Sequence, residues 1–227
     1  MDHALISSLL LGLLLGIVHA LDPDHLIAVG TLAAESKNLR RSALLGVIWG
    51  IGHAMTLGLI GVVVLSLKWT IPVGLAKSME AVVGCMILLL GVQLLWRCWR
   101  PLTVHAHEHH HDGTTHSHVH LHRENQHIHK HHVAVSRVKA LTIGCIHGVA
   151  GSAALSVAVM TTMPSMEAGL SYIAIFGLGS ISGMLLMSTV ISLPFVYVPG
   201  AWQHHMKMST ALLAIGFGGY FTWSFLG

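Results

Sequence analysis

Six apolar stretches divide this chain, and they limit its fold more than any other feature. A transmembrane helix needs about 20 mostly apolar residues. The six windows that meet this requirement are Ala4–Leu21, Ser42–Leu67, Val73–Trp96, Val138–Met160, Leu170–Val198 and Ser209–Leu226. Charged residues make up only 9% of the chain, whereas a typical soluble domain has about 25%. The sequence therefore predicts an all-α integral membrane protein with six transmembrane helices.

The positive charges predict how these helices are oriented. Ten of the twelve Lys and Arg residues lie in or beside the segments that follow the first, third and fifth windows, and only Lys68 and Lys77 lie on the opposite side. Because Lys and Arg are retained in the cytoplasm, we expect both termini outside a bacterial cytoplasmic (inner) membrane and residues 97–136 inside. No basic face with interleaved aromatic residues is present, so nucleic acid is not an expected partner.

The chain divides into two similar halves, residues 1–96 and 137–227, with three windows each. Gly16–Ala20 (Gly-Ile-Val-His-Ala) in the first half resembles Gly144–Gly148 (Gly-Cys-Ile-His-Gly) in the second. Both halves also have a Gly-rich centre in their second helix. Halves of three helices enter the membrane from opposite faces, which is the inverted-repeat plan of many secondary transporters. The alternative is a chance recurrence of small residues, which are frequent in membrane helices.

The segment His19–His25 (His-Ala-Leu-Asp-Pro-Asp-His) places four ionisable side chains at the end of the first window. Ionisable groups inside a membrane are costly and mark functional sites. Pro23 lacks an N–H and clashes with the carbonyl four residues earlier, so we expect the helix to kink or unwind there. An unwound turn would gather His19, Asp24 and His25 around one centre and free the His19 carbonyl. The alternative is a polar cap at the membrane interface.

These side chains are typical ligands of a transition metal. Two imidazoles and a carboxylate suit Ni, Co, Zn, Cu or Fe better than Mg or Ca. Imidazole binds metal only when neutral, so affinity is expected to fall as the pH drops through about 6.5. His53, near the middle of the second window, is a further candidate ligand or gate. The secondary candidates for metal binding or gating are Asp22, His147 and Glu80, for which packing or an interfacial ion pair is the alternative.

The sequence His19-x-x-x-x-Asp24-His25 resembles the signature of the nickel/cobalt transporter family, and more closely its short, UreH-like branch. Family-like elements also occur at Gly52-His53, Ile146–Ala154 and Phe176–Ser180. The resemblance implies that His19, Asp24 and His25 select the metal, with His53 close by. It further implies a permease without an ATPase subunit, with Ni²⁺ or Co²⁺ as substrate and no permanently bound cofactor. The lipid bilayer and cytoplasmic nickel chaperones are the expected partners.

Thirteen of the twenty histidines lie within the polar segment 97–136. They are His105, His107, His109, His110, His111, His116, His118, His120, His122, His127, His129, His131 and His132. A low-complexity segment of this composition is expected to be disordered when metal-free. Closely spaced histidines in a flexible chain bind Ni, Co or Zn with low specificity. The alternative is a solvated spacer without a role in transport.

The predicted function is uptake of nickel or cobalt by a secondary permease. In the related efflux proteins a small residue tends to replace Asp24, so its presence favours uptake, whereas the His-rich segment keeps efflux open. A membrane metal sensor or store is a second alternative. An enzyme is not expected, because no sizeable soluble catalytic portion follows the His/Asp motif.

Overall fold

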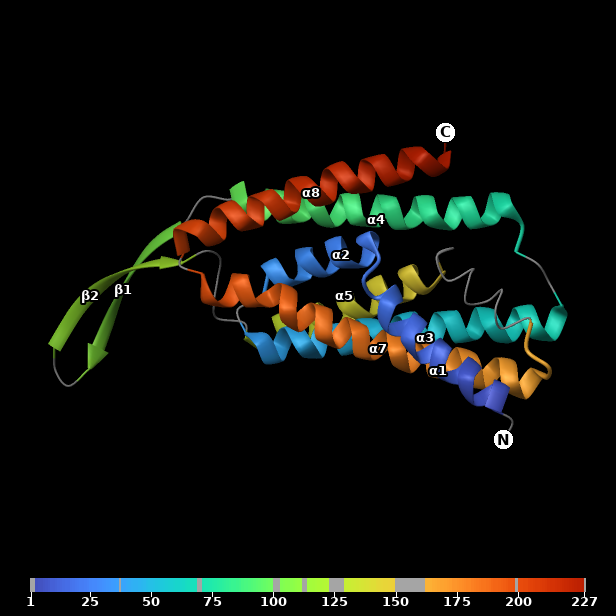
Figure 1. The fold of residues 1–227 in the computed structure, drawn as a ribbon. Helices are drawn as coiled ribbons and strands as arrows, with labels where there is room; N and C mark the ends of the chain where they lie inside the picture. The colour runs from blue at the N-terminus through green and yellow to red at the C-terminus, as the bar shows by residue number, and fades with distance from the viewer. Residues whose placement is uncertain are drawn as a thin grey trace.

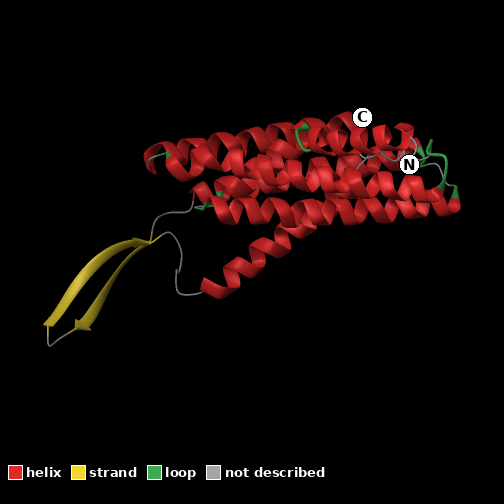
Figure 2. Ribbon diagram, turned by 60° about the horizontal axis from the view of Figure 1, so that its bottom comes forward, coloured by secondary structure: helices red, strands yellow, loops and turns green. Residues whose placement is uncertain are grey.

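The computed structural model describes residues 3–36, 38–68, 71–99, 103–111, 114–122, 129–149, 162–198 and 200–226. Long helices form a bundle, and a two-stranded hairpin lies at one end of it (Figures 1 and 2). The helices are α1 (His3–His19), α2 (Pro23–Ala34), α3 (Leu39–Leu67), α4 (Val73–Trp99), α5 (His129–Val149), α7 (Met166–Tyr197) and α8 (Gly200–Leu226).

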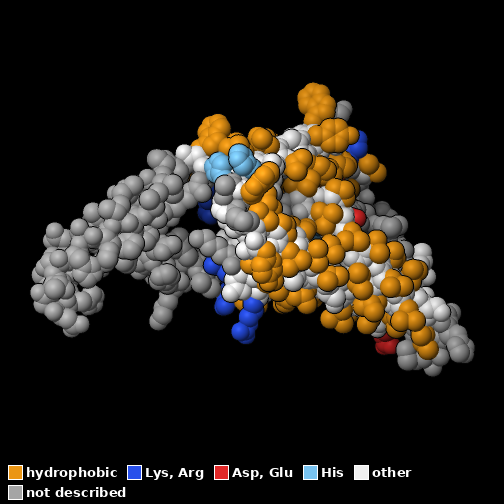
Figure 3. Space-filling view, turned by 60° about the vertical axis from the view of Figure 1, so that its left-hand side comes forward, with side chains coloured by type: hydrophobic (Ala, Val, Ile, Leu, Met, Phe, Trp, Pro, Cys, Tyr) orange, Lys and Arg blue, Asp and Glu red, His pale blue; other side chains and the backbone are white. Residues whose placement is uncertain are grey.

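The length and composition of several helices are those of membrane spans. Among the described residues, α3, α4 and α7 are each long and apolar enough to cross a membrane, and the bent pair α1–α2 adds a fourth crossing if it is one span. The face of the bundle seen in Figure 3 is largely apolar. Large apolar side chains are exposed; for example, Leu59 and Leu213 are 65% and 67% exposed. The protein is therefore a multi-pass helical membrane protein. The count of six spans stays a prediction, since the fourth window continues into residues outside the described part.

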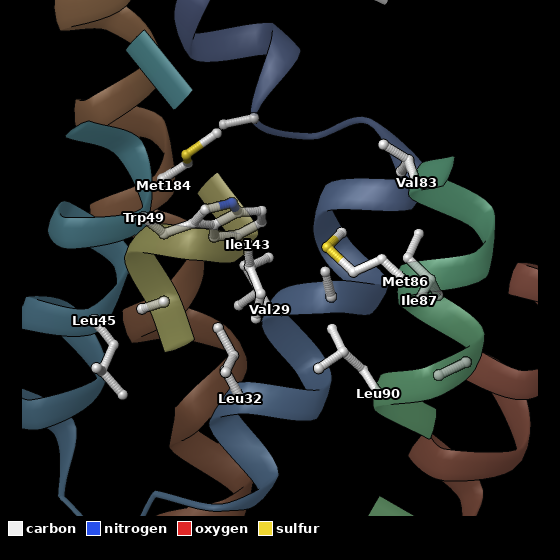
Figure 4. Packing of buried hydrophobic residues seen from close by; sticks show 14 residues of the cluster. Val29, Leu32, Leu45, Trp49, Val83, Met86, Ile87, Leu90, Ile143 and Met184 are labelled. Carbon is white, nitrogen blue, oxygen red and sulfur yellow. The ribbon is translucent and has the colours of Figure 1, made fainter. Parts of the chain in front are cut away.

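The helix α2 lies where the sequence predicted a loop after the first window. Proline is favoured at the first position of a helix because its missing N–H has no partner to lose there, and Pro23 occupies that position. The following residues are apolar but too few to form a span of their own. Helix α2 packs against α4, α7 and α8. Its side chains Val29 and Leu32 lie in the core, between Trp49 of α3 and Leu90 of α4 (Figure 4).

The strands β1 (Thr103–His111) and β2 (Thr114–His122) pair in antiparallel register, with Thr103 opposite His122. A hairpin therefore lies where the sequence predicted a disordered segment. Histidine recurs at alternate positions over much of each strand, and a period of two suits extended chain. The residues between the strands, Asp112 and Gly113, are of types favoured in two-residue hairpin turns.

The backbones of neighbouring helices approach closely at glycines. Helix α1 packs on α7, α5 on α3, α3 on α7, and α4 on α8. A Cβ atom added at Gly16 would overlap the carbonyl oxygen of Phe176, and one added at Gly144 would overlap that of Trp49. Small residues commonly allow such approach between membrane helices. These contacts place the end of α1 against α7 and the end of α5 against α3.

Candidate metal centre

The break between α1 and α2 begins the candidate centre. Helix α1 ends at His19, α2 begins at Pro23, and the two helices are bent by 54°. The predicted kink at Pro23 is thereby confirmed. The prediction that the carbonyl of His19 is free is wrong, because the backbone N–H of Asp22 donates to it at 3.1 Å. The chain leaves α1 through a tight turn, and the carbonyl oxygen of Asp22 then accepts from the N–H of Leu26 at 3.0 Å.

The first group of candidate ligands consists of three histidines. One ring nitrogen each of His19, His25 and His53 lies within 4.8 Å of the other two. The ring centroid of His19 is 4.6 Å from that of His25 and 5.1 Å from that of His53. The centroids of His25 and His53 are 5.3 Å apart. His25 and His53 are fully buried and His19 is 7% exposed. The structure thus brings together residues from the α1–α2 break and from the middle of α3.

The second group consists of Asp24, His25 and His147, whose ligand atoms also lie within 4.8 Å of one another. His147, near the end of α5, is fully buried, and its ring centroid is 4.8 Å from that of His25. Its Nε2 atom lies 3.8 Å from Oδ2 of Asp24. Since His25 belongs to both groups, the two groups form one continuous cluster of five buried side chains.

Hydrogen bonds fix which ring nitrogen His19, His25 and His147 offer to a metal ion. The Nδ1–H group of His19 donates to the Asp22 carboxylate at 2.8 Å, and that of His25 donates to Asp24 at 3.1 Å. In His147, the Nδ1–H group donates to the carbonyl oxygen of Ile143 at 3.2 Å. A carboxylate or carbonyl on one ring nitrogen orients the ring and leaves the other nitrogen as a metal ligand. Asp22, which is half-exposed, therefore orients His19 and belongs to neither ligand group.

The remaining polar atoms of the cluster lack hydrogen bonds. Within the described part of the chain, no partner is found for Nε2 of His19, His25 and His147, for either ring nitrogen of His53, or for Oδ2 of Asp24. An unpaired buried polar group is costly and rare in native proteins. Several of them converging on one point have the chemistry of a cation site, because a divalent metal ion would satisfy nitrogen and oxygen lone pairs together.

Aromatic side chains wall the cluster. Trp49 of α3 stacks on His25 at 5.5 Å between ring centroids and meets His147 edge-on at 5.3 Å. Phe176 of α7 lies 5.5 Å from His19. An apolar shell around a metal site limits water access and strengthens the local electrostatics. Trp49 is not among the site residues predicted from the sequence, although it lies four residues before His53 and hence on the same helix face.

The other sequence candidates have different positions. Glu80 is buried in α4, but it belongs to neither ligand group formed by the described residues. The side chains of the thirteen histidines in segment 97–136 lie outside the described part of the structure, so their metal binding stays a prediction.

Fold and centre together define a class: a multi-pass helical membrane protein with a buried His/Asp cluster at a broken helix. The chain is 41% identical over 191 residues to the urease accessory protein UreH of Bacillus sp. (strain TB-90), across 84% of this chain and 78% of that protein. It therefore belongs to the UreH family, the branch of the nickel/cobalt transporters that its motifs resemble. No known family model and no solved structure matches the chain.

Proposed function

We propose that this protein is a secondary permease that moves Ni²⁺, Co²⁺ or both into the cell across the cytoplasmic membrane. The observation that carries the proposal is the convergence of unpartnered, buried imidazole nitrogens and one carboxylate oxygen from the α1–α2 break, α3 and α5. The name of the similar protein, a urease accessory protein, agrees with a nickel-related role. The total charge of the ligands also fits the proposal, because neutral imidazoles and one carboxylate leave a bound divalent ion only partly neutralised.

The binding step exchanges water for protein ligands. A divalent ion entering the bundle loses hydration and gains the nitrogens of His19, His25 and His53, with Asp24 offsetting part of its charge. Borderline nitrogen ligands favour nickel and cobalt over the hard ions Mg²⁺ and Ca²⁺. Inward movement is favoured by the membrane potential, which contributes about 2.3 kcal/mol for each charge at 100 mV.

We also propose that the transport fold is a three-plus-three inverted repeat. Exchanging α1 with α5, α3 with α7 and α4 with α8 leaves the main pairings of these six helices unchanged, because α1 packs on α7 as α5 packs on α3. The glycine contacts follow the same exchange. Gly16 of α1 lies against the carbonyl of Phe176 in α7, and Gly144 of α5 lies against the carbonyl of Trp49 in α3.

A second pair of contacts supports the same repeat. A Cβ atom at Gly52 of α3 would overlap the carbonyl oxygen of Leu141 in α5, and one at Gly179 of α7 would overlap that of Leu13 in α1. Leu13 precedes Gly16 by three residues, and Leu141 precedes Gly144 by the same interval. Matching contacts at matching spacings favour duplication over chance. Rocking of one half against the other would then open the centre to each side in turn.

The orientation inferred from charge is part of the proposal. The described chain begins and ends at the end of the bundle opposite to the hairpin (Figure 1). An even number of crossings places both termini on one side, and six crossings agree with this arrangement. With Lys and Arg kept inside, the hairpin segment faces the cytoplasm, where its histidines would bind incoming metal and pass it to cytoplasmic nickel chaperones. An efflux permease or a metal store is the alternative that these histidines favour.

Radioactive nickel uptake into cells or sealed vesicles tests the proposal. Wild type is compared with His19→Ala and Asp24→Asn, with cobalt, zinc and manganese as competitors. The matched control is His205→Ala, because His205 is an exposed histidine of α8 outside the cluster. We expect saturable uptake that both centre variants lose and the control keeps. Flux that is insensitive to the centre variants, with metal still bound by the His-rich segment, would contradict the permease and favour a store.

A further inference from the structure

We infer that the centre holds the ion at two adjacent positions in succession, with His147 a ligand of the second. His19, His25 and His53 form the first position. Asp24 and His147 form the second, where the Nδ1–H group of His25 orients Asp24. This inference rests on the proposed transport function and adds to it a second metal position and the order in which the ion occupies the two.

The second position is carried by two acceptors that face each other. Because Nδ1–H of His147 donates to the Ile143 carbonyl, the Nε2 atom carries a lone pair. It faces Oδ2 of Asp24 at 3.8 Å, and neither atom has a hydrogen-bond partner among the described residues. Two ligand atoms that are each about 2.1 Å from one metal ion lie no more than about 4.2 Å apart. Their 3.8 Å separation is therefore short enough for both atoms to bind one ion.

His25 connects the two positions. Its Nε2 atom is a ligand of the first position, and its Nδ1–H group donates to Asp24 of the second. Its ring centroid is 4.6 Å from that of His19 and 4.8 Å from that of His147. Two divalent ions this close together would repel each other strongly in a buried site. The positions are therefore occupied one at a time, and the ion exchanges the histidines of the first position for Asp24 and His147. Exchanging these ligands one at a time keeps the dehydrated ion bound to the protein throughout.

The order of the positions follows from their depth along α3. His147 packs against Trp49, which is one turn nearer than His53 to the start of α3 at Leu39. That end carries Arg40 and Arg41 and is the predicted cytoplasmic end. The second position is therefore the inner one.

A small cavity continues from the second position in the same direction. It begins at Trp49 and is lined mostly by apolar residues of α2 and α3, with Ser42, Ser188 and Ser192 among its residues. These three buried serines are the polar residues that an ion leaving the second position would meet along this cavity.

Nickel binding and transport by His147 variants test the inference. The experiment uses the full-length protein in which the thirteen histidines of segment 97–136 are replaced by glutamine, so that the centre alone binds metal. Two substitutions are compared, His147→Ala and His147→Gln, because glutamine keeps a hydrogen-bonding side chain towards Asp24. Initial uptake rates give KM and the maximal rate, calorimetry gives Kd, and nickel X-ray absorption gives the ligand set.

We expect both variants to bind one nickel ion through imidazole ligands, with an affinity close to that of the unsubstituted centre. Such binding would also show that the variants fold. Their maximal uptake rate should fall at least about tenfold, as expected for the loss of a metal ligand, while KM changes little. Full transport by His147→Gln would overturn the inference, since His147 would then act by hydrogen bonding alone. Loss of nickel binding by both variants would also overturn it, because a single site would then include His147.

These outcomes are separate from those that test the permease itself. If uptake is lost in His19→Ala but kept in both His147 variants, the permease stands and the second position fails. If the wild-type protein shows no uptake that depends on the centre, the proposed function fails first.

Discussion

In the three-plus-three repeat that we propose, the two halves of the chain share their main helix contacts but not their chemistry. The sequence His-Ala-Leu-Asp-Pro-Asp-His at 19–25 corresponds in the second half to His-Gly-Val-Ala-Gly-Ser-Ala at 147–153. Of the ionisable residues in this motif, only the first histidine is present in both halves. His53 in α3 likewise corresponds to Ser180 in α7, which is also fully buried. The comparison teaches that helix contacts are symmetric while ligands are concentrated in one half, so matched substitutions should have matched effects on stability and unequal effects on transport.

The largest effect is expected for His25→Ala. His25 is the one side chain that both ligand groups share, so its loss disrupts either position, and the corresponding residue of the second half has no imidazole. Nickel uptake should fall about 100-fold or more, measured as the initial rate in vesicles. The control is His205→Ala, which should keep the wild-type rate. A His25→Ala protein that transports at even a third of the wild-type rate would mean that neither position depends on His25.

The matched pair His53→Ala and Ser180→Ala tests the unequal chemistry directly. His53 offers two unpartnered ring nitrogens, whereas the Ser180 hydroxyl donates to the carbonyl of Phe176 in its own helix. His53→Ala should weaken nickel binding by about tenfold or more, and Ser180→Ala should leave it close to wild type. Calorimetry on the purified proteins measures both. Equal losses would mean that the two halves contribute equally to the centre.

The pH dependence of binding tests whether imidazoles dominate the centre. Protons compete with metal for each imidazole nitrogen, so nickel affinity should fall progressively as the pH is lowered from about 8 to about 5. Calorimetric titrations over this range give the slope. A flat profile would indicate that carboxylate or backbone oxygens bind the ion instead, in which case the chemical difference between the halves would lie elsewhere.

The matched glycines test the shared packing. An added methyl group at Gly16 or Gly144 would overlap a carbonyl oxygen of the facing helix. Overpacking of this kind costs about 1–3 kcal/mol, which exceeds the helix propensity gained by replacing glycine with alanine, about 1 kcal/mol. Gly16→Ala and Gly144→Ala should therefore lower the Tm in detergent by similar amounts. Gly58→Ala is the control, since a Cβ there meets nothing within 4 Å. A strong effect in only one half would break the comparison.

The smallest effect on transport is expected from the segment between the halves. Replacing its thirteen histidines with glutamine should lower the number of nickel ions bound per protein while the initial uptake rate stays within about twofold of wild type, because low-specificity histidines are not part of the buried centre. Equilibrium dialysis and uptake assays on the same preparations give both quantities. A metal store would instead lose its function completely with these histidines.

The sequence predicted the parts of the centre that depend on local chemistry. Pro23 marks the break in the first helix, because a missing N–H and a ring clash act within one turn of the chain. The approach of His53 to His19 and His25 agrees with the family motif. The helix α2 was missed because its twelve residues are too few for a span, and its burial depends on α4, α7 and α8. The pairing of His147 with Asp24 depends on the packing of α5 against α3, which no local pattern in the sequence encodes.

Anomalous X-ray diffraction at the nickel absorption edge tests the central claim most directly. Crystals of the full-length protein grown with nickel should contain one strong anomalous peak within the cluster of His19, His25, His53, Asp24 and His147, and crystals of His25→Ala should lack that peak. Nickel found only at the histidines of segment 97–136, with the buried cluster empty in the wild-type protein, would contradict the claim that this cluster is the transport site.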